Sequence, residues 1–423
     1  MDKSSKRTAI FVTASLALIF FAGSAELRLR HDDPTFPTVQ ASDLEEDRCS
    51  GMMAQASSSQ DAPASVGVAG GDIVPVRSVE DPYPSLHSVA VDPANNRVVI
   101  SDSNRGSILF YERTAGSSSS QVVVPKWNIR GPATGMMFVA GVALDTANRE
   151  VFAVNNDIGD RMEVFPYGVE GNVKPKRVLF VPHGSWGVSL DKPRDEIAIS
   201  VEHINSVVVY RREASRAEAP LRVIHGLNTG LADPHGIAFD AAANEILIAN
   251  HGNWAPLTRA GASEGAVQGG RFNLPSITTY PIEASGDAKP MRTIQGTQTE
   301  LNWPMGLGLD PIHDEIAVAS YGNNSILVFH RTDNGNAVPV RMIRGNRTGV
   351  LGPVGVAFDP QNNELWVTNY RDHSAVVFPR TAEGNIAPKR ILRNAPLGTP
   401  AVGFGNPGAV AYDSKREEIL VPN

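Results

Sequence analysis

A short apolar phrase that ends in aspartate occurs seven times in this chain, and it constrains the fold more than any other feature. Two examples are Ile237-Ala238-Phe239-Asp240 and Val356-Ala357-Phe358-Asp359. Successive copies lie 46 to 70 residues apart, and their aspartates are Asp92, Asp145, Asp191, Asp240, Asp310, Asp359 and Asp413. Repeats of this length, made of short apolar runs and turns, are typical of a β-propeller with one blade per repeat.

The sixth copy shows how one repeat makes one blade. Its strand-like runs are residues 354–358, 364–368, 374–378 and 388–392. Asp359 and Pro360 follow the first run, where the carboxylate can bond the backbone ahead and proline presets φ for a turn. The chain is therefore predicted to be all-β, with four-stranded antiparallel blades whose strands run A to D in chain order.

The seventh copy is incomplete, because residues 418–421 form its second strand and the sequence stops at Asn423. Residues 65–69 and 75–79 near the other end carry strand-like runs, the latter with a Pro-x-Arg pattern typical of strand D in the other copies. We therefore expect a seven-bladed ring whose last blade is closed by N-terminal strands, which would leave no free sheet edge. The alternatives are a six-bladed ring and an open ring.

The N-terminus has the pattern of an export signal. Lys3, Lys6 and Arg7 precede an apolar run over residues 8–22, and small residues follow up to Ala25. We expect a signal peptide over 1–25, a disordered linker over 26–64 and a propeller domain over 65–423. The mature chain would be periplasmic or extracellular and would have no membrane span after cleavage; the alternative is an N-terminal membrane anchor.

Charge excludes one class of partner and predicts a structural feature. The net charge of −7, without a basic cluster, argues against nucleic-acid binding. Strand B begins with glutamate in six copies, as at Glu150, and strand D carries arginine in five, as at Arg177. Since both charges fall at the same end of each blade, they predict a ring of structural ion pairs.

Antiparallel alternation decides which loops share a face. The D-to-A loops and B-to-C turns lie at one end of the ring, and the A-to-B and C-to-D turns lie at the other. Polar and aromatic residues concentrate at the first end, and convergent polar groups at a concave mouth are the default prediction for a binding site. The predicted binding residues are His87, His183, Trp186, His235, Asn250, His251, Trp254, Tyr321, Asn369 and Tyr370. Residues 252–276 form an insert on this face, which suggests a lid or recognition loop.

Metal chemistry at this mouth was weighed on three histidines. His87, His183 and His235 could supply three ligands with an open position, as in a catalytic zinc site. However, His87 and His235 occupy equivalent positions three blades apart, so they are expected to face each other across the channel. Hydrogen bonds to backbone carbonyls or water explain them equally well, and no metal ligand is assigned. The sequence has no His-Glu-x-x-His, Cys-x-x-Cys, P-loop or EF-hand run, so no catalytic residue is assigned either.

The repeats resemble those of the NHL family and the related lactonase-like (YVTN-type) propellers. The similarity rests on Pro234-His235-Gly236-Ile237-Ala238-Phe239-Asp240 and on Ser325-Ile326-Leu327-Val328-Phe329, and it extends over about residues 65–423. The resemblance implies a propeller whose relatives bind proteins or RNA, amidate with zinc, or open lactones with calcium. Many NHL domains have six blades, and no residue here matches a metal site of that family.

These observations favour an exported binding or scaffold protein whose ligand contacts the mouth that carries His87, Trp186 and His235. The ligand would be a small molecule or another protein, and we expect a monomer without a cofactor. The alternative is a metal-dependent hydrolase or lyase, lactonase-like or amidating-lyase-like, with zinc or calcium at the same mouth.

Overall fold

The structure is a computed structural model, and it describes residues 26–27, 39–40, 81–117, 121–156, 159–254, 271–399, 401 and 411–420. The predicted signal peptide and the two N-terminal strands proposed to close the ring, residues 65–69 and 75–79, lie outside these ranges. Among the described residues, no helix has the length and apolar character that a membrane crossing requires.

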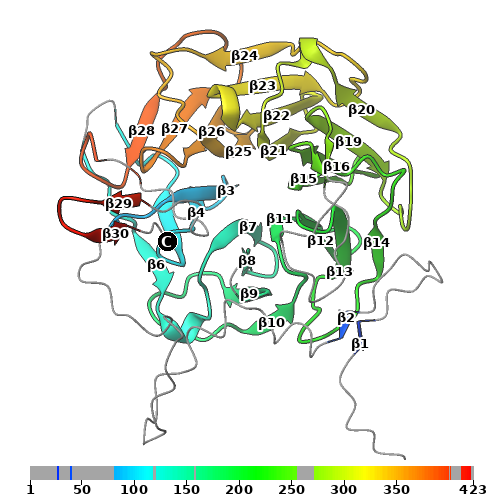
Figure 1. The fold of residues 1–423 in the computed structure, drawn as a ribbon, viewed down its shortest axis with the longest axis horizontal. Coiled ribbons are helices and arrows are strands. Elements are labelled where there is room, and N and C mark those ends of the chain that lie inside the picture. Colours follow the sequence, from blue (N-terminus) through cyan, green and yellow to red (C-terminus); the bar gives the residue numbers. More distant parts are fainter. Residues whose placement is uncertain are drawn as a thin grey trace, which may run out of the picture.

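The described residues form a ring of six four-stranded antiparallel sheets (Figure 1). Strand A is innermost in each blade: β3 (Leu86–Asp92), β7 (Val139–Asp145), β11 (Ser185–Asp191), β15 (Pro234–Asp240), β21 (Pro304–Asp310) and β25 (Pro353–Asp359). Strand B follows: β4 (Arg97–Asp102), β8 (Glu150–Asn155), β12 (Glu196–Val201), β16 (Glu245–Asn250), β22 (Glu315–Ser320) and β26 (Glu364–Asn369). Strand C comes next: β5 (Ser107–Glu112), β9 (Arg161–Pro166), β13 (Ser206–Arg211), β19 (Ser276–Pro281), β23 (Ser325–His330) and β27 (Ser374–Pro379). Strand D is outermost: β6 (Trp127–Arg130), β10 (Arg177–Phe180), β14 (Arg222–Ile224), β20 (Arg292–Gln295), β24 (Arg341–Arg344) and β28 (Arg390–Arg393).

The prediction of four-stranded propeller blades is confirmed, but the prediction of seven blades is wrong. Blade 6 packs directly against blade 1, with β25 beside β3. A buried apolar cluster joins the two blades through residues such as Leu86, Val89 and Tyr111 from one and Trp366 and Val377 from the other. The ring is therefore closed by six blades, which was the stated alternative.

The same clasp joins every pair of neighbouring blades. At each junction, a residue in the C-to-D loop of one blade pairs with strand D of the blade before it. Five of these bridges are Ile129–Gly171, Leu179–Arg216, Ile224–Gly286, Ile294–Gly335 and Ile343–Gly384. At the sixth junction, Ser117 of blade 1 pairs with Ile391 of blade 6, and Val122 pairs with Arg393. Blades 6 and 1 thus meet as ordinary neighbours.

Glycines in strand A allow the blades to approach closely at the centre. A Cβ on Gly236 would lie closer than 3.0 Å to the backbone carbonyl oxygen of Met305 in the next blade. Gly355 makes the equivalent approach to the carbonyl oxygen of His87 in blade 1. No side chain fits at such a contact without moving backbone, so glycine is required where one inner strand passes the next.

The A-to-B turns and the predicted ion pairs form one end of the ring, called here the aspartate end. The repeat aspartates accept hydrogen bonds from the turn backbone, as Asp92 Oδ1 does from the amide of Asn95 (3.2 Å). The predicted glutamate–arginine pairs are confirmed in blades 2 to 6, each with two hydrogen bonds: Glu150–Arg177, Glu196–Arg222, Glu245–Arg292, Glu315–Arg341 and Glu364–Arg390.

Blade 1 replaces this ion pair with a different contact. Arg97 stands where the other blades have glutamate, and Trp127 stands where they have arginine. The guanidinium carbon of Arg97 lies 4.0 Å from the centre of the Trp127 ring. A cation–π contact therefore fills the place of the ion pair.

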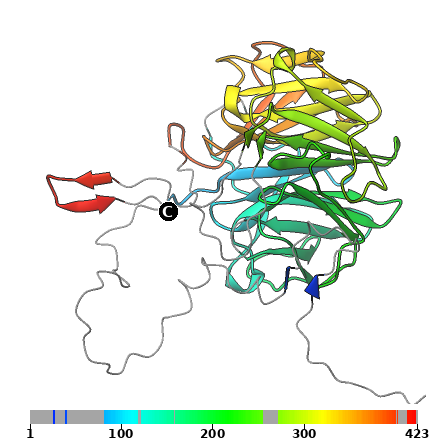
Figure 2. The same cartoon turned by 45° about the vertical axis from the view of Figure 1, so that its right-hand side comes forward.

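The seventh copy of the repeat forms only a two-stranded hairpin, β29 (Ala411–Asp413) with β30 (Glu418–Leu420). Figure 2 shows this hairpin, in red, outside the ring. Two further short ribbons occur. β1 (Glu26–Leu27) pairs with β2 (Val39–Gln40) within the predicted linker, and β17 (Asn253–Trp254) pairs with β18 (Arg271–Phe272) at the base of the predicted insert.

Candidate ligand site at the histidine end

The D-to-A loops and B-to-C turns form the opposite end of the ring, called here the histidine end. Its side chains come from two positions of each strand A entry and from the residue after each strand B. The fifth residue before each repeat aspartate supplies His87, Trp186, His235 and Met305. These residues begin or precede the bulge at which strand A shifts register against strand B. Since the bulge is irregular, it can aim a side chain at the channel rather than into the sheet.

Trp186 separates the two histidines that were predicted to face each other. Its ring centre lies 5.0 Å from that of His87 and 4.4 Å from that of His235, with an edge-on arrangement in both contacts. His87 Nδ1 lies 2.7 Å from the carbonyl oxygen of Ala140 in the neighbouring blade. The structure therefore does not bring His87 and His235 together as ligands of one small ion.

An arc of stacked rings continues from His235 around the mouth. His251 stacks on His235 with ring centres 3.5 Å apart, and Trp303 lies parallel to His251 at 5.7 Å. Tyr321 stacks on Trp303 at 6.1 Å, and the guanidinium of Arg371 covers Tyr321 at 4.5 Å. Together with Trp186, these residues form what is called here the aromatic arc.

Two carboxylates reinforce the arc from below. Glu202 Oε2 lies 3.0 Å from His235 Nε2, and Glu202 Oε1 accepts a hydrogen bond from Asn156 Nδ2 at 3.0 Å. Asp233 lies on the other side of His235, with its Oδ1 3.5 Å from His235 Nδ1 and its Oδ2 3.4 Å from His251 Nδ1. His235 is thus held between two acids in an almost fully buried position.

Burial and charge separate the protonation behaviour of the three buried histidines. Burial lowers the pKa of His87 to about 4. Burial and the nearby charge of His235 lower the pKa of His251 to about 4 as well. Burial also opposes protonation of His235, but the hydrogen bond to Glu202 and the charges of Asp233 and Glu202 raise its pKa above the ordinary value. The site therefore holds one protonation-prone imidazole beside two that stay neutral.

The carboxylates complement this arrangement. Although burial of Glu202 favours its neutral form, hydrogen bonds from His203 and His235 lower its pKa below the ordinary range. His251 and His235 likewise lower the pKa of Asp233 against the effect of burial. Both acids are therefore ionised at neutral pH.

A small cavity lies in the channel beneath this mouth. Its volume is about 100 Å³, and strand A residues of all six blades line it, among them His87, Trp186, Gly236, Met305 and Val354. Since one water occupies about 30 Å³ of liquid, the cavity holds a few waters at most. A ligand larger than this must contact the mouth and cannot pass into the channel.

The remaining predicted site residues have varied surroundings. Asn250 Nδ2 bonds Thr278, and Asn369 Nδ2 bonds Ser374 and the carbonyl of Gly349, so hydrogen bonds within the blade account for both side chains. His183 Nδ1 lies 2.9 Å from Asp160. Trp254 stacks under Arg271 at the base of the insert, and Tyr370 meets the His87 ring edge-on at 5.9 Å.

Sequence reasoning missed Asp233 and Trp303, which share one repeat position. Both lie seven residues before the repeat aspartate, and both have a left-handed backbone, with φ of 57° and 50°. The equivalent residues in blades 3 and 6 are Gly184 and Gly352, also with positive φ. An aspartate and a tryptophan at positions where glycine is free of strain are a recognisable signal, because such strain accumulates at functional sites.

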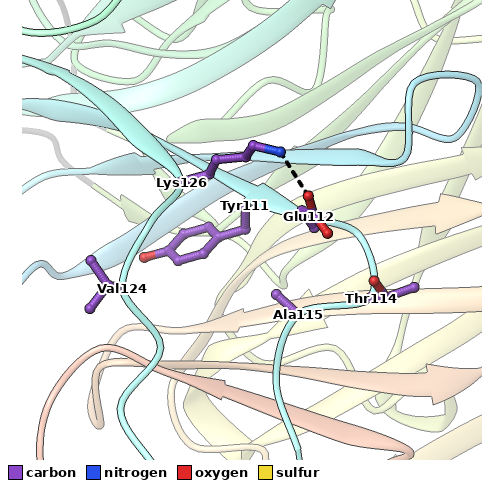
Figure 3. A pocket seen from close by; sticks show the side chains of 6 residues that line it. All are labelled: Tyr111, Glu112, Thr114, Ala115, Val124 and Lys126. Atoms are coloured by element: carbon purple, nitrogen blue, oxygen red, sulfur yellow. Dashed lines mark hydrogen bonds and ion pairs between the residues drawn. The ribbon is translucent and has the colours of Figure 1, made fainter.

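A second hollow lies far from this mouth. It has a volume of about 420 Å³ at the outer edge of blade 1, and Tyr111, Glu112, Thr114, Ala115, Val124 and Lys126 line it (Figure 3). Its charged residues, Lys126 and Glu112, pair with each other at 2.8 Å. It lacks the convergent unpaired chemistry of the histidine end, so its larger size does not make it the better candidate.

No family profile matches the sequence, and no curated protein matches it. Among solved structures, a chain of a nidogen/laminin complex is 14% identical over 73% of this chain and 95% of its own length, with a TM-score of 0.44. A chain of hydrazine synthase from Kuenenia stuttgartiensis is also 14% identical, over 74% of this chain and 100% of its own, with a TM-score of 0.49. The assignment of the propeller fold rests on the strand pairing of this chain itself. The resemblance to NHL and lactonase-like propellers stays a prediction.

Proposed function

We propose that this protein is an exported binding protein whose ligand contacts the histidine end of the propeller. The observation that carries the proposal is the aromatic arc with its buried acids. It is built from residues that differ from blade to blade. A feature needed to hold blades together recurs in every blade, whereas Trp186, His235 and Trp303 have no copies elsewhere in the ring.

The composition of the arc indicates the chemistry of the ligand. Flat rings offer stacking surface with little conformational entropy to lose, as in many recognition surfaces. Trp303 is 46% exposed and held in a strained backbone conformation, so its edge is available at the rim. Glu202 and Asp233 make the floor acidic. A planar or cationic small molecule, or a protein side chain of that kind, fits this combination.

A thermal-shift screen tests the proposal. Wild-type protein and Trp186→Ala would be screened against a panel of aromatic amines, guanidines, sugars and carboxylates, with each shift measured from the melting temperature of that variant alone. We expect amines and guanidines to stabilise the wild type and to lose most of that effect in the variant.

Ile312→Ala is the matched control, since Ile312 is 75% exposed in an A-to-B turn at the aspartate end. Ligands of the histidine end should stabilise Ile312→Ala as they do the wild type. Stabilisation that survives Trp186→Ala but disappears in Ile312→Ala would move the site to the wrong end and refute the proposal.

A metal-dependent hydrolase or lyase is the second candidate function. It is favoured by one observation, the contact of the ionised Asp233 with His235 and His251. Hydrolysis of a lactone panel that stops on adding a chelator and returns with added metal would support it. Turnover that is absent, or that is unaffected by the chelator, would count against it.

A further inference from the structure

The strongest unexplained cluster at the histidine end is the contact among Asp233, His235 and His251. All three come from blade 4: Asp233 precedes β15, His235 lies in β15, and His251 follows β16. One potential ligand atom from each residue lies within 4.8 Å of the others. The cluster therefore needs no reach across the channel, unlike the set of His87, His183 and His235 weighed from the sequence.

The separations within the cluster suit a bound ion better than direct hydrogen bonds. The two nitrogen–carboxylate distances are 3.5 Å for His235 Nδ1 and 3.4 Å for His251 Nδ1. Hydrogen bonds between nitrogen and oxygen span about 2.7–3.2 Å. Ligands of a tetrahedral ion with bonds of about 2.0–2.1 Å lie about 3.3–3.4 Å from one another. The observed spacing is close to the second value.

Each of the three residues is also held from outside the cluster. Glu202 Oε2 contacts His235 Nε2, the ring nitrogen that faces away from Asp233. Asn253 Nδ2 donates to Asp233 Oδ2 at 3.0 Å, and Asn205 Oδ1 accepts from the Asp233 amide at 3.0 Å. A carboxylate behind a ligating histidine fixes its tautomer and orientation, which is the usual outer arrangement of metal ligands.

Two local changes would accompany binding. His235 Nδ1 now lies 3.0 Å from the carbonyl oxygen of Asp233, and an ion would replace that contact. The rings of His235 and His251 are stacked at an angle of 15°, so one ring must turn for both nitrogen lone pairs to meet one ion. His251 can turn at small cost, because its Nε2 contacts only the thioether of Met305, a weak acceptor.

We propose that Asp233, His235 and His251 bind one divalent ion of the zinc type at the mouth of the propeller, with Glu202 positioning His235. Two imidazoles and one carboxylate are borderline ligands that favour zinc and its transition-metal neighbours, whereas calcium requires six to eight oxygens. Three protein ligands leave a fourth position open to the mouth. The inference rests on the proposed function only in that the ion would share the face used by the ligand.

A metal titration of the full chain tests the site directly. Protein purified without a histidine tag and stripped with a chelator would be titrated with Zn²⁺ in competition with a chromophoric chelator. We expect one ion per chain. Asp233→Asn and His251→Gln should each weaken affinity by at least about tenfold, and Glu202→Gln by about 10- to 100-fold.

His313→Asn is the matched control. It removes a histidine at the aspartate end, where asparagine occupies the equivalent turn position in blades 1, 2 and 6 and keeps the bond to the repeat aspartate. Its affinity for zinc should equal that of the wild type. Wild-type binding of less than about one tenth of an ion per chain would overturn the proposal. Unchanged affinity in both Asp233→Asn and His251→Gln would do the same.

A spectroscopic measurement on the wild type covers the case in which a variant fails to fold. X-ray absorption of the zinc-loaded chain should show two imidazole ligands at about 2.0–2.1 Å; one imidazole or none would refute the assignment. Repeating the thermal-shift screen with chelator present separates the two proposals. Ligand binding that persists without metal leaves the proposed function intact even if the metal site is refuted.

Discussion

The two ends of the ring are built from the same repeat but obey different rules. At the aspartate end, one position carries the same residue in nearly every blade: a repeat aspartate in the turn, glutamate at the start of strand B and arginine in strand D. At the histidine end, one position carries Trp186, His235 or Met305 according to the blade. Uniformity along the ring therefore marks residues that hold the blades together, and variation marks residues available for recognition.

The largest expected effect concerns the uniform end. Glu150→Ala removes a buried carboxylate that accepts hydrogen bonds from Arg177, Arg212 and Lys176. Two arginines would be left partly buried without their partner, so the free energy of unfolding should fall by about 4 kcal/mol. Chemical denaturation of the two proteins measures the difference.

Glu213→Ala is the control, because Glu213 also bonds Arg212 but is 65% exposed at its side chain. It should leave stability unchanged within error. Equal losses in the two variants would show that the buried pairs are worth no more than surface pairs, and the contrast between the ends would lose its energetic basis.

Acid should weaken the two ends over different pH ranges. The pKa of His87 is about 4 in the folded state, below its model value of 6.5. Below pH 6.5 the unfolded chain takes up a proton that folded His87 refuses, so stability falls as the pH drops from 6.5 to 4, by about 3 kcal/mol from this group. His87→Gln should flatten the stability profile in that range.

The aspartate end should respond at lower pH. Hydrogen bonds from Arg177 and Lys176 outweigh burial and lower the pKa of Glu150 from 4.5 to about 2. Its contribution is complete above pH 4.5 and is lost as the pH falls toward 2. Urea titrations at a series of pH values measure both ranges. A His87→Gln profile parallel to the wild type between pH 6.5 and 4 would contradict the assignment.

Arg113→Ala tests whether blade 6 and blade 1 meet as ordinary neighbours. Arg113 of blade 1 donates to Glu364 of blade 6 at 2.8 Å, as Arg380 of blade 6 does to Glu315 of blade 5 at 2.9 Å. Both substitutions should cost about 2 kcal/mol, the scale of a hydrogen bond to a charged group. A neutral Arg113→Ala beside a costly Arg380→Ala would indicate a ring that is open in solution.

Trp303→Gly should have the smallest effect on stability. Loss of the ring removes stacking on His251 and Tyr321, but glycine relieves the left-handed backbone at a position where blades 3 and 6 already have glycine. We expect a change in the free energy of unfolding of less than about 1 kcal/mol together with loss of ligand stabilisation. A loss of stability comparable to that of Glu150→Ala would make Trp303 a packing residue.

The strands, the turns and the ion pairs could be predicted because they depend on contacts close in the repeat. The number of blades could not, because it depends on whether Ser117 pairs with Ile391 and Arg113 with Glu364, contacts between opposite ends of the ring. Residue patterns show that a seventh phrase ends at Asp413. They do not show that blade 1 already occupies the face of blade 6 that a seventh blade would need.

The candidate site was predictable in part for a similar reason. His235 and Trp186 stand at a position whose direction follows from the strand pattern. Asn250 and Asn369 share a position with Asn155, and this recurrence already favours the hydrogen bonds within the blade that the structure shows. Glu202 contributes through its distance to His235, in the next blade, and such pairings between blades cannot be obtained from one repeat alone.

The hairpin β29–β30 has a bearing on how such a chain arises. It carries the turn and the terminal aspartate of the repeat, yet it has no neighbour to clasp it as Ser117 clasps strand D of blade 6. Duplication of a genetic unit and closure of a ring are separate events, and the first can continue after the second is complete. The number of copies in the sequence then records ancestry, while the number of blades records the curvature at which strand D of one unit meets the loop of the first.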